Sequence, residues 1–222
     1  MGQLEIACFN LASALIAQEN DADRIELCDG FEVGGTTPSM ETVFKIKEFL
    51  SIDLYVMIRP RGGNFVYTDD EFLQMKTNIL EFKKLQVNGF VFGILNSDNF
   101  INVSQNTELV ALAKPFPCTF HRAFDEVSNP FLSLEEIITC GFQTILTSGQ
   151  SQNVVGGVNQ LAALVKKANT RIEIMPGGGL RSTNVRFIQE ETKAKWFHSS
   201  AITNGNEEAH AIEVKALKSK LK

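Results

Sequence analysis

The sequence has few cysteines, and none of them belongs to a CxxC pair. Only Cys8, Cys28, Cys118 and Cys140 occur in 222 residues. Their spacing fits neither a zinc-binding motif nor a disulfide-stabilised scaffold. We therefore expect Cys118 and Cys140 to be small buried residues in a reducing compartment.

Long apolar runs and a basic surface are also missing. No apolar stretch is long enough to span a bilayer, and the first residues lack the basic and apolar regions of a signal peptide. The net charge is −5, and Lys and Arg are dispersed until the last lysines, which suit the end of a helix opened by Glu207 and Glu208. These features predict a soluble cytoplasmic protein that binds neither membranes nor nucleic acids.

What the sequence does contain is a regular alternation of strand and helix patterns. The strands are expected near 3–8, 23–28, 53–59, 90–94, 117–122, 143–148, 171–175 and 195–199. The helices are expected near 11–19, 40–50, 69–86, 105–113, 132–140, 157–169, 181–191 and 207–220. Two helix starts are expected at Thr68 and Ser133, each followed by carboxylates. No Gly-x-Gly-x-x-Gly follows the first strand, which favours one closed (β/α)₈ barrel over residues 1–222 rather than an open doubly wound sheet.

Polar residues and glycines follow most of these strands. Thr119 to Asp125 reads TFHRAFD, so a histidine, an arginine and an aspartate leave one short strand together, and Arg59 leaves another. The strands of an α/β barrel end at a common mouth, where its active sites lie. The pattern therefore predicts a site at the carboxyl ends of the strands.

The chain resembles the CutC copper-homeostasis proteins along nearly its whole length. The matching stretches are RIELC from Arg24, GGTTPS from Gly34, MIRPRG from Met57 with Phe65 and Tyr67, TFHRAFD from Thr119, LTSG from Leu146, MPGGG from Met175 and HSSA from His198. Two positions depart from the family pattern, which usually has an aspartate at Asn78 and a glycine at Gln150. The resemblance implies a TIM barrel, a cytoplasmic location, copper binding and a homo-oligomer, for which we expect a dimer. It implies no defined reaction.

Strand alternation indicates which side chains face the barrel interior. If the apolar residues of each strand pack against the helices, the side chains that face inward are Glu5, Arg24, Glu26, Cys28, Tyr55, Met57, Arg59, Thr119, His121, Glu173 and Met175. The enclosed carboxylates must then find Arg24, Arg59, His121 or water at the mouth, because an unpaired buried charge costs several kcal/mol.

Five of the polar residues are candidates for acid/base chemistry. His121 would exchange a proton, Arg59 would neutralise an anionic substrate, and Glu26 or Asp125 would orient the imidazole. His198 is a second candidate, although it shares its parity with Trp196 and fits a hydrogen-bonded core histidine equally well. Arg122 is expected to pair on the opposite face. The alternative for Glu26, Arg59 and His121 is a closed ion-pair network without chemistry.

A glycine-rich loop follows the seventh strand. The amides of Gly177, Gly178 and Gly179, with the Ser199 hydroxyl on the next strand, would bind phosphate, as the loops after strands seven and eight do in many TIM barrels. The alternative is a tight turn into the helix expected near Arg181.

Cu(I) favours thiolate and thioether ligands. Cys28 ends the second strand with inward parity, and Met57 and Met175 could assist it. Cys8 ends the first strand with outward parity, so it enters the copper site mainly through the resemblance. The alternative is that Cys8 and Cys28 are small buried residues.

Two functions remain open. One is a copper homeostasis protein that binds Cu(I) without turning over a substrate. The other is a TIM-barrel enzyme that acts by acid/base chemistry on a small anionic or phosphorylated compound at the barrel mouth. No nucleotide cofactor is expected for either function.

Overall fold

A computed structural model describes residues 2–205 and 207–222. Eight strands are found there: β1 (Gln3–Cys8), β2 (Arg24–Leu27), β3 (Asp53–Met57), β4 (Gly89–Phe92), β5 (Cys118–Phe120), β6 (Thr144–Thr147), β7 (Glu173–Pro176) and β8 (Trp196–Ser199). The α-helices are α1 (Leu11–Glu19), α2 (Met40–Lys47), α3 (Asp69–Lys84), α4 (Val103–Ala113), α5 (Pro130–Cys140), α6 (Val158–Ala168), α7 (Val185–Thr192) and α8 (Ala211–Lys220). Two short 3₁₀ turns, η1 (Phe31–Val33) and η2 (Arg122–Glu126), follow β2 and β5.

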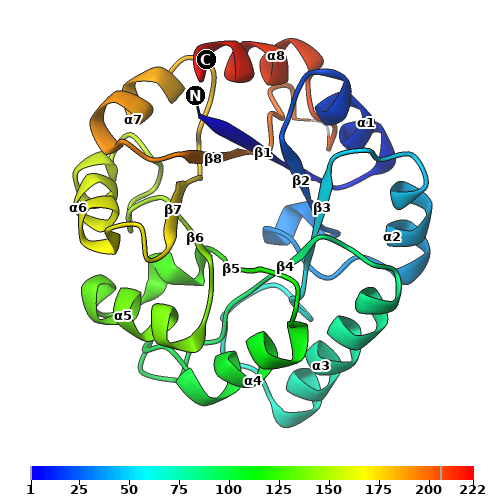
Figure 1. Cartoon of the computed structure of the whole chain (residues 1–222), viewed down its shortest axis with the longest axis vertical. Coiled ribbons are helices and arrows are strands. Elements are labelled where there is room, and N and C mark those ends of the chain that lie inside the picture. The colour runs from blue at the N-terminus through cyan, green and yellow to red at the C-terminus, as the bar shows by residue number, and fades with distance from the viewer. Residues whose placement is uncertain (1, 206) are drawn as a thin grey trace.

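The strands form one parallel sheet in the order β7-β6-β5-β4-β3-β2-β1-β8. Figure 1 shows them as a ring with the helices outside and the two chain ends side by side. The ends of the sheet meet at β7 and β8, where a side chain on Gly177 would lie only 3.0 Å from the His198 Cβ. The expected (β/α)₈ TIM barrel is therefore confirmed.

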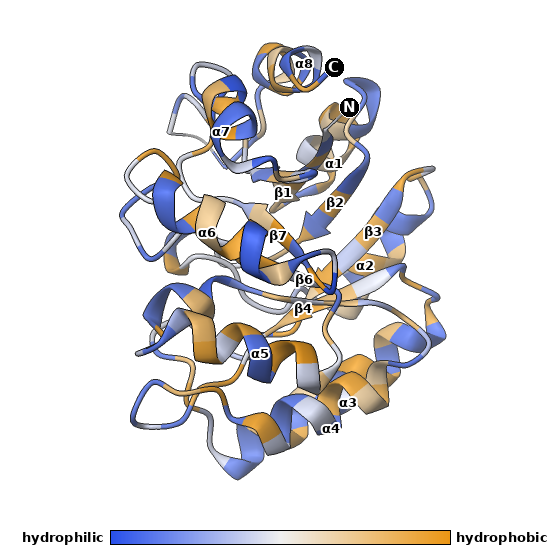
Figure 2. Cartoon of the chain, turned by 60° about the vertical axis from the view of Figure 1, so that its left-hand side comes forward, coloured by the Kyte–Doolittle hydropathy of each residue, from blue (hydrophilic) through white to orange (hydrophobic). Residues whose placement is uncertain are grey.

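Strand alternation separates two sets of buried side chains. Ile25 and Leu27 belong to the large hydrophobic core between the barrel and its helices. Cys28, Tyr55 and Met57, together with Val91, form a small separate cluster inside the barrel. The expectation that these side chains of β2 and β3 face the barrel interior is confirmed. Figure 2 shows that the surrounding helices carry both hydrophilic and hydrophobic residues.

Capping side chains define several helix starts. The Thr68 hydroxyl accepts a hydrogen bond from the Glu71 amide, and the Glu71 carboxylate accepts one from the Thr68 amide, so the expected start of α3 is confirmed as a capping box. The expected start at Ser133 is wrong. Asn129 caps α5 and Pro130 opens it, while Ser133 is buried inside the helix.

Two other helices begin later than expected. Arg181 lies in a turn in which its amide donates to Asn184 Oδ1, so α7 begins only at Val185. The last helix begins at Ala211 rather than at Glu207, whose backbone oxygen accepts a hydrogen bond from Asn10. Among the described residues, no helix is long and apolar enough to cross a membrane.

Candidate functional site

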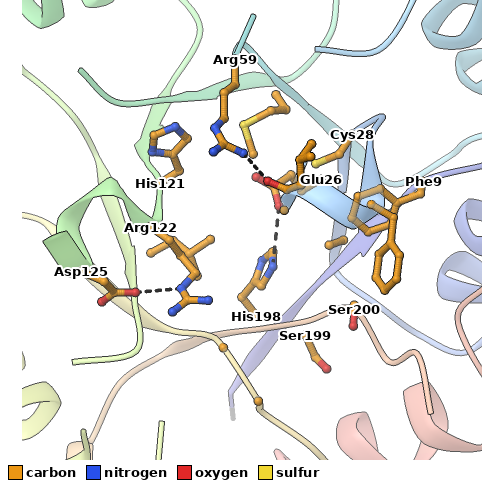
Figure 3. Close-up of a pocket in the computed structure, with 18 of the residues that line it drawn as sticks. Phe9, Glu26, Cys28, Arg59, His121, Arg122, Asp125, His198, Ser199 and Ser200 are labelled. Carbon is orange, nitrogen blue, oxygen red and sulfur yellow. Dashed lines mark hydrogen bonds and ion pairs between the residues drawn. The ribbon is translucent and has the colours of Figure 1, made fainter. Parts of the chain in front are cut away.

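A pocket opens at the carboxyl ends of the barrel strands, where the polar residues of the sequence were expected to gather. Its volume is about 440 Å³. Figure 3 shows side chains from several strands and loops converging on it. The polar residues in its wall are Glu26, Arg59, His121, Arg122, Asp125, Glu126, Arg181, His198, Ser199 and Ser200.

A chain of charged side chains runs from the barrel interior to the pocket, which its last members, His198 and Glu26, line. Glu5 Oε2 accepts from Arg24 Nε at 2.5 Å, and Glu5 Oε1 lies 2.7 Å from His198 Nδ1. Arg24 is held between the rings of Tyr55 and Trp196, at 4.1 and 4.0 Å from their centroids. Complete burial would raise the pKa of Glu5, but the charges and hydrogen bonds of Arg24 and His198 outweigh this effect and lower the pKa to about 2. Glu5 is therefore an ionised anchor that fixes the orientation of the His198 ring.

Glu26 continues this chain into the pocket. Its Oε2 lies 3.6 Å from His198 Nε2, and its buried Oε1 has no hydrogen-bond partner. Burial, with a smaller contribution from Glu5, raises the pKa of Glu26 to about 7. The pKa of His198 is also raised, because its bond to Glu5 and the charge of Glu26 oppose the effect of burial. Glu26 is therefore set to gain or lose a proton near neutral pH.

His121 is not joined to either expected orienting carboxylate. Its Nδ1 accepts a hydrogen bond from the Ala123 amide at 3.3 Å, and its buried Nε2 has no partner. Burial and the nearby charge of Arg59 lower the pKa of His121 to about 3. An imidazole that accepts at Nδ1 carries its proton on Nε2. His121 is therefore held as a neutral imidazole, whose Nε2 keeps its proton and has no partner among the described residues.

Asp125 supports the loops instead of orienting His121. Its carboxylate accepts hydrogen bonds from the Thr147 hydroxyl, from the amide and hydroxyl of Ser148, and from the Gln150 amide. It also pairs with Arg122 Nε at 2.7 Å. The expectation that Arg122 faces away from the mouth is wrong, because η2 turns its side chain into the pocket wall (Figure 3).

Arg59 bonds to backbone oxygens rather than to carboxylates. Its guanidinium donates to Val33 O, Gly35 O and Gly63 O at 2.7–2.9 Å. The side chain is buried, and no carboxylate of the described residues pairs with it within 4.0 Å. The closed network expected as one alternative for Glu26, Arg59 and His121 is therefore not formed. The network that does form joins Glu5, Arg24, His198 and Glu26.

The two candidate copper ligands lie in different environments. Cys28 lines the pocket, and a β-carbon added at Gly35 would lie 3.3 Å from its Sγ and 3.5 Å from Met57 Cε. Cys8 belongs to the core outside the barrel, beside Leu27 in the sheet register. Burial and the neighbouring Glu26 raise the pKa of the Cys28 thiol well above its usual value. The Cys28 sulfur and the Met57 side chain thus lie together at the pocket wall, and any metal bound by Cys28 would have to displace the thiol proton.

Some groups of the expected phosphate site already have hydrogen-bond partners within the protein, whereas others line the pocket. The Gly177 amide donates to Thr147 O, and the Ser199 hydroxyl donates to Leu180 O while accepting from Arg181. These two groups therefore have hydrogen-bond partners already and do not lie open to an anion. Gly178 and Gly179 do line the pocket.

The sequence did not reveal that Arg181 lines the pocket and donates to the Ser199 hydroxyl, or that Glu5 pairs with His198. The sheet register places Glu5 and His198 opposite each other on β1 and β8. A closed barrel brings its first and last strands together, so the expected fold carried this signal. Glu5, Glu26 and His198 also offer ligand atoms within 4.8 Å of one another, a set that could hold a borderline metal ion.

Comparison with known proteins gives a consistent result. The model of the CutC family matches residues 2–203. The copper homeostasis protein cutC homolog of Homo sapiens is 42% identical over 198 residues, which cover 89% of this chain and 72% of that protein. A CutC protein of Parabacteroides distasonis is 46% identical, with 89% and 82% covered.

Solved structures agree with this result. The crystal structure of CutC from Streptococcus agalactiae is 38% identical, with a TM-score of 0.87, and the match covers 91% of this chain and 100% of that chain. Phosphoribosyl anthranilate isomerase from Thermotoga maritima has a TM-score of 0.64 at 17% identity, which shows a shared fold alone. With its family model spanning most of the sequence and relatives above 40% identity, this chain belongs to the CutC copper homeostasis family.

Proposed function

We propose that this chain is a cytoplasmic copper homeostasis protein that binds Cu(I) at Cys28. The observation that carries the proposal is that the Cys28 sulfur and the terminal methyl carbon of Met57 both lie against Gly35 at the pocket wall, within one small cluster inside the barrel. A cysteine thiolate and a methionine thioether are soft ligands of the kind that Cu(I) prefers. Cys8 joins the proposal through the family resemblance, because its thiol faces the outer core and would have to turn to reach a metal at Cys28.

A titration of Cu(I) against a competing chelator under reducing conditions tests this site. Cys28→Ser should weaken Cu(I) binding at least tenfold, because serine removes the thiolate. Cys118→Ser and Cys140→Ser are matched controls, since both thiols are buried outside the pocket. Equal affinity in all three variants would remove Cys28 from the site.

The family resemblance also supports a homo-oligomer, for which we propose a dimer. Sedimentation velocity at several protein concentrations measures this directly. A single species with the mass of one chain at all concentrations would contradict it.

A second candidate function is proton transfer on a small anionic substrate. The observation in its favour is the Arg24–Glu5–His198 chain, which ends at a buried Glu26 whose pKa is about 7. A general acid or base is most effective when its pKa lies near the working pH. In this function Glu26 exchanges the proton with the substrate, His198 exchanges it with Glu26, and the neutral His121 donates a hydrogen bond.

Hydrogen–deuterium exchange into substrate carbon tests this second function. The protein is incubated in D₂O with a panel of small carbonyl compounds, with and without phosphate groups, and their masses are followed. Glu26→Gln should slow any exchange by roughly 10²–10⁴-fold, the usual contribution of a general base. No exchange by the unaltered protein with any member of the panel would remove this candidate.

A further inference from the structure

Two glycines of the loop after β7, Gly178 and Gly179, line the pocket. Gly178 and Gly179 have φ of +98° and +71°, values that favour glycine. Their carbonyl oxygens accept from the Val154 amide and from Asn184 Nδ2, whereas neither glycine amide has a partner among the described residues. Open amides in a left-handed loop of this kind make a concave site for an anion.

Arg122 lies directly beside these glycines. A β-carbon on Gly178 would lie 3.1 Å from Arg122 Cζ and 3.3 Å from its Nη1. Asp125 and the Ser148 hydroxyl hold Arg122 through its Nε and Nη2, and Nη1 has no hydrogen-bond partner in the described part of the chain. The guanidinium is thus held in place with one nitrogen open beside the glycine loop.

Arg181 brings a second positive charge to the same pocket. Its Nη1 donates to Leu180 O and to the Ser199 hydroxyl, and its Nη2 donates to Ile202 O. These partners are neutral, and no carboxylate in residues 2–205 or 207–222 pairs with it within 4.0 Å. A molecule of net charge −5 therefore keeps an arginine without a counter-charge at this mouth. An anionic ligand would supply the missing charge.

We infer that the amides of Gly178 and Gly179, with Arg122 and Arg181, form a subsite for the phosphate group of a small phosphorylated ligand. Two amides and two guanidinium groups that line one pocket suit a tetrahedral oxyanion better than a planar carboxylate. The assignment rests on the second candidate function for the rest of the ligand, because Glu26 and His198 line the same pocket. This subsite differs from the phosphate site expected from the sequence, because the Gly177 amide and the Ser199 hydroxyl of that site already have protein partners.

Calorimetric titration with inorganic phosphate at constant ionic strength tests the subsite in the full chain. Phosphate and sulfate should bind the unaltered protein more tightly than acetate. Arg122→Met should weaken phosphate binding at least tenfold. Arg186→Met is the matched control, because Arg186 also pairs with a carboxylate but lies exposed on α7, outside the pocket. The amide proton resonances of Gly178 and Gly179 should shift on titration, a readout that needs no variant to fold.

The outcomes separate this inference from the proton-transfer proposal. Phosphate binding without deuterium exchange into any compound would support the subsite and contradict the proton-transfer function. Absence of phosphate binding to the unaltered protein would overturn the subsite, whatever the exchange experiment gives. Equal weakening by Arg122→Met and Arg186→Met, or unshifted Gly178 and Gly179 resonances, would overturn it as well.

Discussion

Glu26 shows how one buried side chain links stability to chemistry. The residue is 3% exposed, and one of its oxygens has no partner. Its pKa rises from 4.5 to about 7 on folding, chiefly through burial. The folded protein therefore binds more protons than the unfolded chain between these pH values. The contribution of Glu26 to stability is complete below about pH 4.5 and is lost as the pH rises through 7.

We predict that Glu26→Gln makes the protein more stable at pH 8 than the unaltered chain. Glutamine cannot ionise, so the variant avoids the cost of the buried charge. The stability gain should be larger at pH 8 than at pH 5 by on the order of 2 kcal/mol. Chemical denaturation at the two pH values measures it, with the exposed Glu190→Gln as control. A gain that does not change between pH 5 and pH 8 would contradict the raised pKa.

The sequence predicted the direction of the site side chains better than their partners. Glu26 and His121 both face the pocket as strand alternation required, because the side-chain period of a strand is two. The partner of His121 could not be read in the same way. Asp125 lies in a 3₁₀ turn, where strand alternation does not apply, and its oxygens are bound by the β6 loop.

At the scale of elements, two inward arginines have different tasks. Arg24 neutralises the fully buried Glu5 at the barrel floor. Arg59 joins two loops, because it donates to Val33 O and Gly35 O after β2 and to Gly63 O after β3. One residue thus stabilises the barrel, whereas the other fixes the loops that form the pocket wall.

We predict that Arg24→Met costs much more stability than Arg59→Met. Removal of Arg24 leaves a buried carboxylate without its partner, which typically costs about 3–5 kcal/mol. Removal of Arg59 leaves no carboxylate unpaired and only deprives loop carbonyl oxygens of a hydrogen-bond donor, so the loss of stability should be roughly 1–2 kcal/mol. Denaturation midpoints compare the two variants. Hydrogen exchange should rise at residues 33–37 and 61–64 in Arg59→Met alone, and an equal global loss in both would contradict the assignment.

The start of α3 was predicted correctly because a local capping motif marks it, whereas the start of α5 was missed although Asn129 caps it. Thr68 and Glu71 form a reciprocal box that the sequence displays in full. The first turn expected for the last helix was predicted from its carboxylates alone. In the structure the backbone oxygen of Glu207 instead accepts a hydrogen bond from Asn10, the residue that caps α1. A long-range contact of this kind is absent from any local pattern.

For the whole molecule, the barrel mouth combines groups whose charges respond to pH in opposite ways. Glu26 gains a proton on folding near neutral pH, whereas His121 is held neutral with a pKa of about 3 against 6.5 in the unfolded chain. The unfolded chain therefore binds one more proton at His121 between pH 6.5 and pH 3. This difference stabilises the folded protein above pH 6.5 and is lost progressively as the pH falls.

We predict that His121→Gln makes the molecule more resistant to acid. The glutamine side chain can also accept the hydrogen bond from the Ala123 amide, but it cannot be protonated in this pH range. The stability of the variant should therefore fall less below neutral pH than that of the unaltered protein. The difference between the two proteins should grow by on the order of 3 kcal/mol from pH 7 to pH 4, since each pKa unit is worth about 1.36 kcal/mol. Free energies of unfolding in urea measure this at several pH values. His210→Gln is the matched control, because His210 is exposed at the start of α8. If His121→Gln and His210→Gln respond to acid alike, the neutral state of His121 does not govern the acid stability of this barrel.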